Sequence, residues 1–171
     1  MRWLTFISLL SVTALADYPP DIDDYFSFSK HVGSGVGISY GIVGKGRITG
    51  VRVWEANNNY IYGIQLRYGY AWTNITGYPY GQVQEMKLFE GEAIVQLSGK
   101  YSHYVQSLVF TTNMGRSLFA GQPRGHSFNM YPRKEKAELR FISGRYNGAI
   151  TSIGAHWGVV SDPYRKTPNY L

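Results

Sequence analysis

The chain has 171 residues, a length that suits one domain, and it contains no cysteine, which excludes disulfides and cysteine metal ligands. Its 17 Lys and Arg residues exceed its 11 Asp and Glu residues, for a formal charge of +6. Residues 25–158 carry 14 basic side chains against six glutamates and no aspartate, a formal +8, so this part of the chain attracts polyanions.

Residues 1–16 have the pattern of a secretory signal peptide. Arg2 precedes an apolar run, Leu4–Leu15, and Ala14–Ala16 matches the small-residue pattern of a cleavage site. The apolar run is too short to span a bilayer, so we expect no transmembrane segment. The sequence therefore predicts a secreted, extracellular protein, with storage in a secretory granule as the related alternative. In that setting we expect no nucleic-acid partner, and the polyanions at hand are sulfated glycans or acidic mucus.

The rest of the chain divides into three parts. Residues 17–24 are acidic and contain two prolines, which predicts a loose N-terminal arm. Residues 25–159 are the predicted folded domain, and residues 160–171 are predicted to be a flexible C-terminal tail.

Within the domain, short segments that alternate apolar and polar residues predict about a dozen strands separated by turns. In chain order these are Tyr25–Lys30, Ile48–Glu55, Tyr60–Gly69, Tyr70–Thr73, Val83–Phe89, Ala93–Leu97, Leu108–Thr112, Arg116–Phe119, Ser127–Tyr131, Ala137–Ile142 and Ile150–Val159. No stretch sustains a helical period, so the predicted fold class is all-β.

Between the first two predicted strands, the segment His31–Ile38 has glycine at positions 33, 35 and 37. It lacks the Gly-Lys-Ser/Thr ending of a phosphate-binding loop. Two interpretations stay open: a tight turn where two backbones approach closely, or a loop whose bare amides face a ligand. Further along, Asn74 opens an Asn-Ile-Thr glycosylation sequon.

A repeated unit occupies the second half of the domain. Ser98–Leu108 aligns without a gap on Ser143–Ile153, at an offset of 45 residues, and Gly46–Val53 is a fainter third copy. Each copy has the pattern of a strand, a small loop and a second strand. A repeat of this period in so short a chain favours a closed three-fold arrangement.

Catalytic chemistry is poorly supported by the residue pattern. The four histidines lie on different segments without metal-ligand spacing, and His156 alternates with apolar residues as a strand side chain would. No nucleophile elbow is present. The closely spaced carboxylate pairs, Glu90/Glu92 and Glu135/Glu138, are interpreted as turn and surface charge. We therefore predict a protein that is not an enzyme and uses no metal or cofactor.

The charge run 133–136 is interpreted as solvated surface or as one contributor to a polyanion-binding face. Six basic residues are candidates for that face: Lys100, Arg124, Arg133, Lys134, Lys136 and Arg145.

Several segments between residues 25 and 158 resemble the animal zymogen granule protein 16 family, secretory lectins with a single jacalin-related domain. The segments that carry the resemblance are Gly33–Gly37, Ile48–Val53, Gly63–Gly69, Gln96–Tyr101, Leu108–Thr112, Ser127–Asn129, Leu139–Arg145 and Ile153–Trp157. The resemblance implies a jacalin-like β-prism of three four-stranded antiparallel sheets with pseudo-three-fold symmetry, which the 45-residue repeat suggests independently. It also implies a metal-independent sugar site at one end of the prism.

Carried onto this sequence, the sugar site would use Gly37 and Ile38 of the glycine-rich loop together with the last inter-strand loop. That loop contains Tyr146, Asn147, Gly148, Ala149, Ile150 and Thr151, with Arg124 and His126 on a neighbouring recognition loop.

The last loop departs from the family pattern. Mannose-binding members carry G-x-x-x-D there, whereas this chain has Asn147 in place of the glycine and Thr151 in place of the aspartate. A hydroxyl offers fewer acceptor sites than a carboxylate, and a lost charged acceptor weakens binding by about 1.5–3 kcal/mol. Ile38 also stands where a basic residue often follows the glycine-rich loop. We therefore expect an altered mannose-type site.

Two hypotheses from different classes follow. The first is a secreted glycan-binding protein with partners among mannose-type, sulfated or acidic polysaccharides and glycoproteins, including peripheral association with granule membrane proteoglycans. The second is a structural or packaging protein of granules or mucus with a vestigial sugar site. An exposed aromatic patch of Tyr78, Tyr80, Tyr101 and Tyr104 would favour the second.

Overall fold

The computed structural model describes residues 26–57 and 59–159, and these residues form strands, turns and loops only. The predicted signal peptide, acidic arm and C-terminal tail lie outside them. The strands are β1 (Phe26–Phe28), β2 (Val32–Gly33), β3 (Ile38–Ile42), β4 (Ile48–Glu55), β5 (Ile61–Tyr68), β6 (Ala71–Trp72), β7 (Thr76–Gly77), β8 (Gln82–Lys87), β9 (Ile94–Tyr101), β10 (Val105–Thr112), β11 (Ser117–Gly121), β12 (His126–Met130), β13 (Ala137–Asn147) and β14 (Ala149–Val159). The prediction of an all-β fold is confirmed. No helix in the described ranges is long and apolar enough to cross a membrane.

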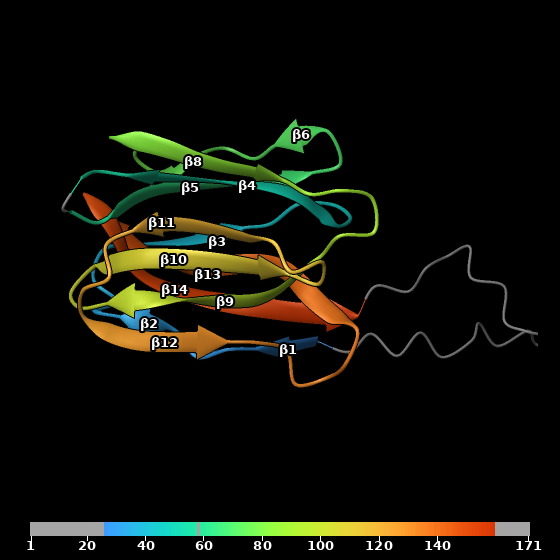
Figure 1. Cartoon of the computed structure of the whole chain (residues 1–171). Coiled ribbons are helices and arrows are strands. Elements are labelled where there is room, and N and C mark those ends of the chain that lie inside the picture. The colour runs from blue at the N-terminus through green and yellow to red at the C-terminus, as the bar shows by residue number, and fades with distance from the viewer. Residues whose placement is uncertain (1–25, 58, 160–171) are drawn as a thin grey trace, which may run out of the picture.

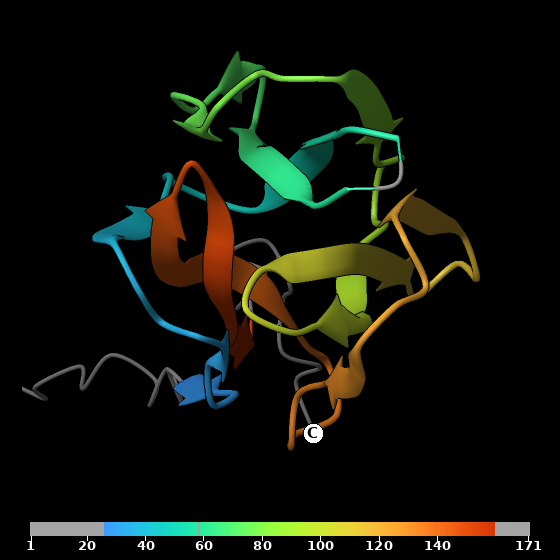
Figure 2. The same cartoon turned by 90° about the vertical axis from the view of Figure 1, so that its left-hand side faces the viewer.

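The strands form three antiparallel sheets, each built around a long hairpin (Figures 1 and 2). The hairpins are β4–β5, β9–β10 and β13–β14, and each has further strands on both edges. β8 and β6 flank the first hairpin, β12 and β11 the second, and β3 and β1 the third. Seen from the end, the three sheets enclose a common centre, which is the predicted β-prism (Figure 2).

Two of the sheets have five strands rather than the predicted four. In each case one edge position is divided into two short strands. β1 and β2 pair with successive parts of β14, and β6 and β7 pair with successive parts of β5. The pseudo-three-fold plan is unchanged by this division.

The hydrophobic core lies between the three sheets. Branched aliphatic side chains predominate in it: Ile, Leu and Val from all three hairpins are almost fully buried there. Phe110 and Trp157 are the largest fully buried side chains. Burying a branched aliphatic or aromatic side chain contributes about 1.5–3 kcal/mol, so this shared interior replaces the stabilisation that disulfides would give.

The 45-residue repeat is confirmed as two equivalent hairpins. Gly99 pairs with Leu108 in the first, and Gly144 pairs with Ile153 in the second, at the same offset. Most of the fainter third copy, Gly46–Val53, lies in β4, the equivalent strand of the remaining hairpin. Val53 occupies there the place of Gly99 and Gly144, and each hairpin has one unpaired residue in its second strand two positions before the partner of that residue.

Two glutamates predicted as turn and surface charge are buried instead. Glu92 pairs with Arg116 at 2.7 Å, and Glu138 pairs with Arg47 at 2.5 Å. Glu138 lies in β13 and Arg47 immediately precedes β4, so this pair joins two sheets. A buried carboxylate requires such a partner, and removing the partner from a buried pair costs about 3–5 kcal/mol.

Candidate functional site

Three loops of the pattern G-x-x-x-G lie at one end of the prism, spaced 44 residues apart. They are Gly33–Gly37, Gly77–Gly81 and Gly121–Gly125. The first glycine of each loop lies against the carbonyl oxygen of a residue that bulges from the neighbouring hairpin. In the same order these bulged residues are Thr151, Tyr62 and Gln106. The end with these loops, which faces the reader in Figure 2, is therefore built three times on one plan.

The first loop lies directly against the tip of the β13–β14 hairpin. Gly37 has a φ of +104°, and a Cβ there would overlap the carbonyl oxygen of Tyr146. Ile38 then pairs with Tyr146, and Arg145 donates a hydrogen bond from its guanidinium to the Gly37 carbonyl at 2.8 Å. Only glycine fits this close approach. The glycine-rich loop and the last hairpin thus lie side by side, as the resemblance implies.

The residues predicted for the last loop divide into exposed and buried groups. Asn147 and Gly148 are exposed at the hairpin tip, and Tyr146 is half-buried beside them. Ala149 and Ile150 are buried under the tip. Of these five, only the first three can present side-chain or main-chain atoms to a ligand.

Thr151 requires a correction. It was expected to offer its hydroxyl to a sugar, but the side chain is fully buried and its Oγ1 donates to the Val36 carbonyl at 2.5 Å. The physical reason is the β-bulge at this position, which turns the residue under the glycine-rich loop. Thr151 holds the glycine-rich loop, and its hydroxyl is not open to solvent.

Arg124 and His126 are exposed at the same end, on the third G-x-x-x-G loop and the start of β12. Gly125 between them lies against the Tyr101 carbonyl of β9. The β9–β10 turn then contacts the glycine-rich loop, because the Ser34 amide donates to the His103 carbonyl at 3.4 Å. Arg124 and His126 are therefore separated from Gly37 by this turn.

The six basic candidates do not form a single surface. Three of them lie toward the loop end: Lys100, Arg124 and Arg145. For Arg124 this follows because His126, which begins β12 two residues later, pairs with Tyr101. Arg133, Lys134 and Lys136 follow β12 and precede β13, which puts them at the opposite end of the 11-residue strand β13. A polyanion that engages the glycine-rich loop would meet the first group only.

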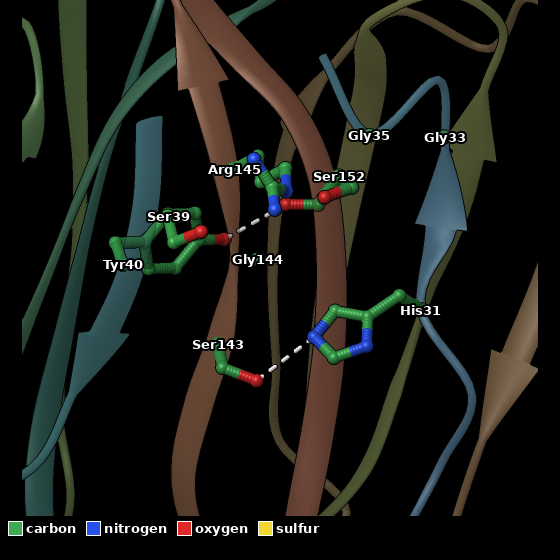
Figure 3. Close-up of a pocket in the computed structure, with 9 residues that line it drawn as sticks. All are labelled: His31, Gly33, Gly35, Ser39, Tyr40, Ser143, Gly144, Arg145 and Ser152. Atoms are coloured by element: carbon green, nitrogen blue, oxygen red, sulfur yellow. Dashed lines mark hydrogen bonds between the residues drawn. The ribbon is translucent and has the colours of Figure 1, made fainter. Parts of the chain in front are cut away.

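A groove of about 410 Å³ opens on the outer face of the third sheet, beside the glycine-rich loop (Figure 3). Its lining includes Ser39, Tyr40, Ser143 and Ser152 together with His31 and Arg145. A second groove of about 330 Å³ lies over the second sheet and includes Ser98, Lys100 and Ser107, the repeat equivalents of Ser143, Arg145 and Ser152. Sequence reasoning missed both grooves, although the 45-residue alignment already matched their hydroxyls and cations.

His156 is a strand side chain, as predicted, and belongs to a polar cluster at the first groove. The Ser143 hydroxyl lies 2.9 Å from His31 Nε2 and 2.7 Å from His156 Nε2. The His156 ring stacks on Phe141 at 4.0 Å. Burial, and secondly the charge of His31, lower the pKa of His156. Among the described residues, no group of three or more His, Cys, Asp or Glu side chains is placed to hold a metal ion.

The tyrosines of the predicted aromatic patch differ in exposure. Tyr78 and Tyr80 are exposed, but Tyr101 is half-buried against Phe128. Tyr104 is half-buried and in ring contact with Tyr60, at 4.3 Å. Tyr60 contacts Tyr62, and Tyr62 contacts Tyr80, so ring contacts link Tyr104 to Tyr80. The packaging hypothesis stays open. Asn74 is exposed, and its glycosylation stays a prediction.

A three-sheet prism with a glycine-rich loop against the last hairpin defines a lectin of the jacalin-like class. The family model described as "Jacalin-like lectin domain" matches residues 29–156. The chain belongs to this family, which is one of carbohydrate-binding proteins, and this membership confirms the prediction of a protein that is not an enzyme.

The chain is similar to zymogen granule membrane protein 16 of Homo sapiens, with 43% identity over 136 residues, which are 78% of this chain and 81% of the relative. The protein of that name from Rattus norvegicus is 45% identical over 112 residues, 66% of each chain. Among solved structures, a prostate-specific WGA16 glycoprotein lectin matches with a TM-score of 0.70 and 30% identity, covering 79% of this chain and all of that one. Single-chain recombinant jacalin, at 17% identity, shares the fold with a TM-score of 0.68, covering 80% of this chain and 96% of jacalin. The predicted membership of the zymogen granule protein 16 family is confirmed.

Proposed function

We propose that this protein is a metal-independent lectin that binds glycans at the loop end of the prism, in contact with Gly37, Ile38, Asn147 and Gly148. The single observation that carries the proposal is the close contact of Gly37 with Tyr146, which joins the glycine-rich loop to the exposed hairpin tip. Such a shallow surface offers main-chain groups to sugar hydroxyls, which are donors and acceptors at once.

The preferred ligands are acidic or sulfated glycans rather than mannose. Residues 25–158 contain no aspartate, and the Thr151 hydroxyl already donates to the Val36 carbonyl, so the mannose-type acceptor is missing. In its place stands the exposed guanidinium of Arg145, held on the Gly37 carbonyl. Guanidinium groups form strong charge-assisted hydrogen bonds with sulfate and carboxylate oxygens. Secretion and association with granule proteoglycans fit this chemistry and the similarity to zymogen granule membrane proteins.

Binding of a heparin hexasaccharide and of methyl α-mannoside, measured by calorimetry at 0.1 M and 1 M salt, tests this function. We expect the heparin affinity to fall at least tenfold at high salt, because the Debye length shrinks from about 10 Å to 3 Å. Methyl α-mannoside should bind weakly and without salt dependence.

A pair of matched variants locates the site. Arg145→Gln removes the guanidinium beside Gly37, whereas Arg133→Gln removes one at the opposite end of the prism. The first should weaken heparin binding about tenfold and the second less than twofold. Equal effects of the two variants, or strong salt-insensitive mannose binding, would contradict the proposal.

A further inference from the structure

A groove lined by tyrosines opens beside the proposed site and shares only Gly148 with it. It has a volume of about 390 Å³ and is lined by Tyr62, Tyr78, Tyr80 and Gly148. Tyr78 and Tyr80 belong to the second G-x-x-x-G loop, and Gly148 is the tip of the last hairpin. The groove therefore lies between two neighbouring loops of the loop end.

The tyrosine rings are held in place although they are largely open to solvent. Tyr80 packs edge-on against Tyr62 with centroids 4.9 Å apart, and the Tyr62 hydroxyl accepts a hydrogen bond from Asn59 at 2.8 Å. Tyr78 packs edge-on against Tyr146 at 6.3 Å. Even so, Tyr78 and Tyr80 are 50% and 61% exposed. Rings that are already ordered lose little conformational freedom when a ligand covers them.

The chemistry of the lining selects a class of ligand. Phenol rings offer flat apolar faces to the C–H groups of a pyranose, and their hydroxyls can bond to its hydroxyls. No charged side chain lines the groove, so nothing there compensates the desolvation of a sulfate or a carboxylate. The lining therefore fits a neutral hexose and not a sulfated one.

The position of the groove links it to the proposed site. A Cβ on Gly37 would come within 2.8 Å of the Asn147 side chain, and the next residue, Gly148, already lines the groove. The hairpin tip thus borders the glycine-rich loop on one side and the tyrosines on the other. A single hexose would contact one of these two surfaces, whereas two linked sugar residues of an oligosaccharide would contact both.

We propose that this groove is a second subsite, which takes a neutral pyranose residue of an oligosaccharide whose neighbouring residue contacts the glycine-rich loop. The inference rests on the proposed function, since the first residue must be held there. In this proposal Tyr80 and Tyr78 make the protein prefer longer oligosaccharides, a preference that the contact at Gly37 alone does not provide.

Affinities of methyl α-mannoside, mannobiose and mannotriose, measured by NMR titration, test the subsite, with a heparin hexasaccharide as reference. The wild-type protein should bind mannotriose about tenfold more tightly than methyl α-mannoside. Tyr80→Ala should abolish that gain and leave the monosaccharide affinity unchanged, whereas Tyr80→Phe, which keeps the ring, should retain most of it. Tyr80 is exposed, so neither change disturbs the core.

A second variant fills the groove without touching the tyrosines. Gly148 has a φ of +70°, which asparagine tolerates, and a Cβ there meets no atom within 4 Å. Gly148→Asn should therefore fold and should reduce the ratio of mannotriose affinity to methyl α-mannoside affinity. The ratio is compared because Gly148 also belongs to the proposed site. Heparin binding without any gain from mannoside to mannotriose, or a gain that survives Tyr80→Ala, would overturn the subsite alone. Failure of all four probes to bind the wild-type protein would overturn the proposed function with it.

Discussion

Thr151 shows how a β-bulge can change the direction in which a side chain points. It occupies the bulged position of its hairpin, which in the other two hairpins is filled by Tyr62 and Gln106. At this position the hydroxyl points under the first G-x-x-x-G loop and donates to the Val36 carbonyl. A side chain that looks like a weakened sugar acceptor in the sequence is thus a support for the loop that we propose contacts the sugar.

Replacing Thr151 with Val tests this support. The change removes one buried hydrogen bond and leaves the Val36 carbonyl without that donor, so we expect a loss of about 1 kcal/mol in unfolding free energy. Glycan affinity should fall as well, because the loop is no longer fixed. Thr151→Ser keeps the hydroxyl and should preserve both quantities. Chemical denaturation and a heparin titration measure them, and a Val variant that binds like the wild type would contradict the assigned role.

The cluster of His31, Ser143 and His156 predicts a pH dependence of stability. Burial and the neighbouring His31 lower the pKa of His156 in the folded protein below the ordinary value of 6.5. Between the two pKa values the unfolded chain therefore binds more protons than the folded one. The stabilisation is complete above about pH 6.5 and is lost as the pH falls through the folded-state pKa.

Thermal unfolding followed from pH 7.5 to 5 measures this effect. His156→Phe retains the ring stacked on Phe141 but cannot be protonated. The variant should therefore show a smaller decrease in Tm over this range than the wild type. An identical decrease in the two proteins would mean that another group titrates there.

The burial and the partners of single residues were the hardest features to predict from the sequence. Glu92 and Glu138 stand next to charged or turn-forming neighbours in the sequence, yet each is buried beside an arginine. Their partners, Arg116 and Arg47, lie 24 and 91 residues away. Local pattern cannot reveal pairs of that separation, because one forms only when the strands of a sheet pair and the other only when two sheets meet.

Among the structural elements, the G-x-x-x-G loop occurs three times, once beside each hairpin. Each begins with a glycine that lies against the carbonyl of a bulged residue in the second strand of the hairpin. Each ends with a glycine that lies against the first strand of the same hairpin. The final glycines are Gly37, Gly81 and Gly125, which lie against the carbonyls of Tyr146, Glu55 and Tyr101. One contact thus repeats around the axis, and in the third sheet, at Gly37, it forms part of the proposed site.

Gly37→Ala and Gly35→Ala compare two glycines of the same loop. Both have positive φ, 104° and 69°, but a Cβ at position 37 overlaps the Tyr146 carbonyl, whereas at position 35 it meets nothing within 4 Å. We expect Gly35→Ala to cost about 1 kcal/mol and Gly37→Ala roughly 2–3 kcal/mol, with loss of glycan binding only in the latter. Denaturation midpoints and heparin titrations measure this. Equal effects would show that the loop does not depend on its contact with the hairpin.

Elements were predicted well where their period was clear. The predicted strand Ile48–Glu55 matches β4 residue for residue. The last two strands were predicted too short: β13 continues to Asn147 and β14 begins at Ala149, since glycines and polar residues in them were taken as loop. The glycine-rich segment left two interpretations open. The close approach of its backbone to Tyr146 confirms the tight turn, whereas contact of its amides with a ligand stays a proposal.

For the whole molecule, the repeat and the family resemblance predicted the prism, but not the distribution of charge over it. The basic residues near position 133 and those near the glycine-rich loop lie at opposite ends, separated by the length of β13. Net charge is a property of composition, whereas a binding surface depends on where chain reversals place each cation. The two ends are therefore expected to differ in glycan contact.

The central claim is that glycans contact the loop end. A titration of the ¹⁵N-labelled protein with the heparin hexasaccharide, followed through backbone amide shifts, tests it most directly. We expect the largest changes at Gly37, Ile38, Asn147 and Gly148, with little change near Arg133. The largest shifts near Arg133, or none at Gly37 and Gly148 when the hexasaccharide is saturating, would contradict it.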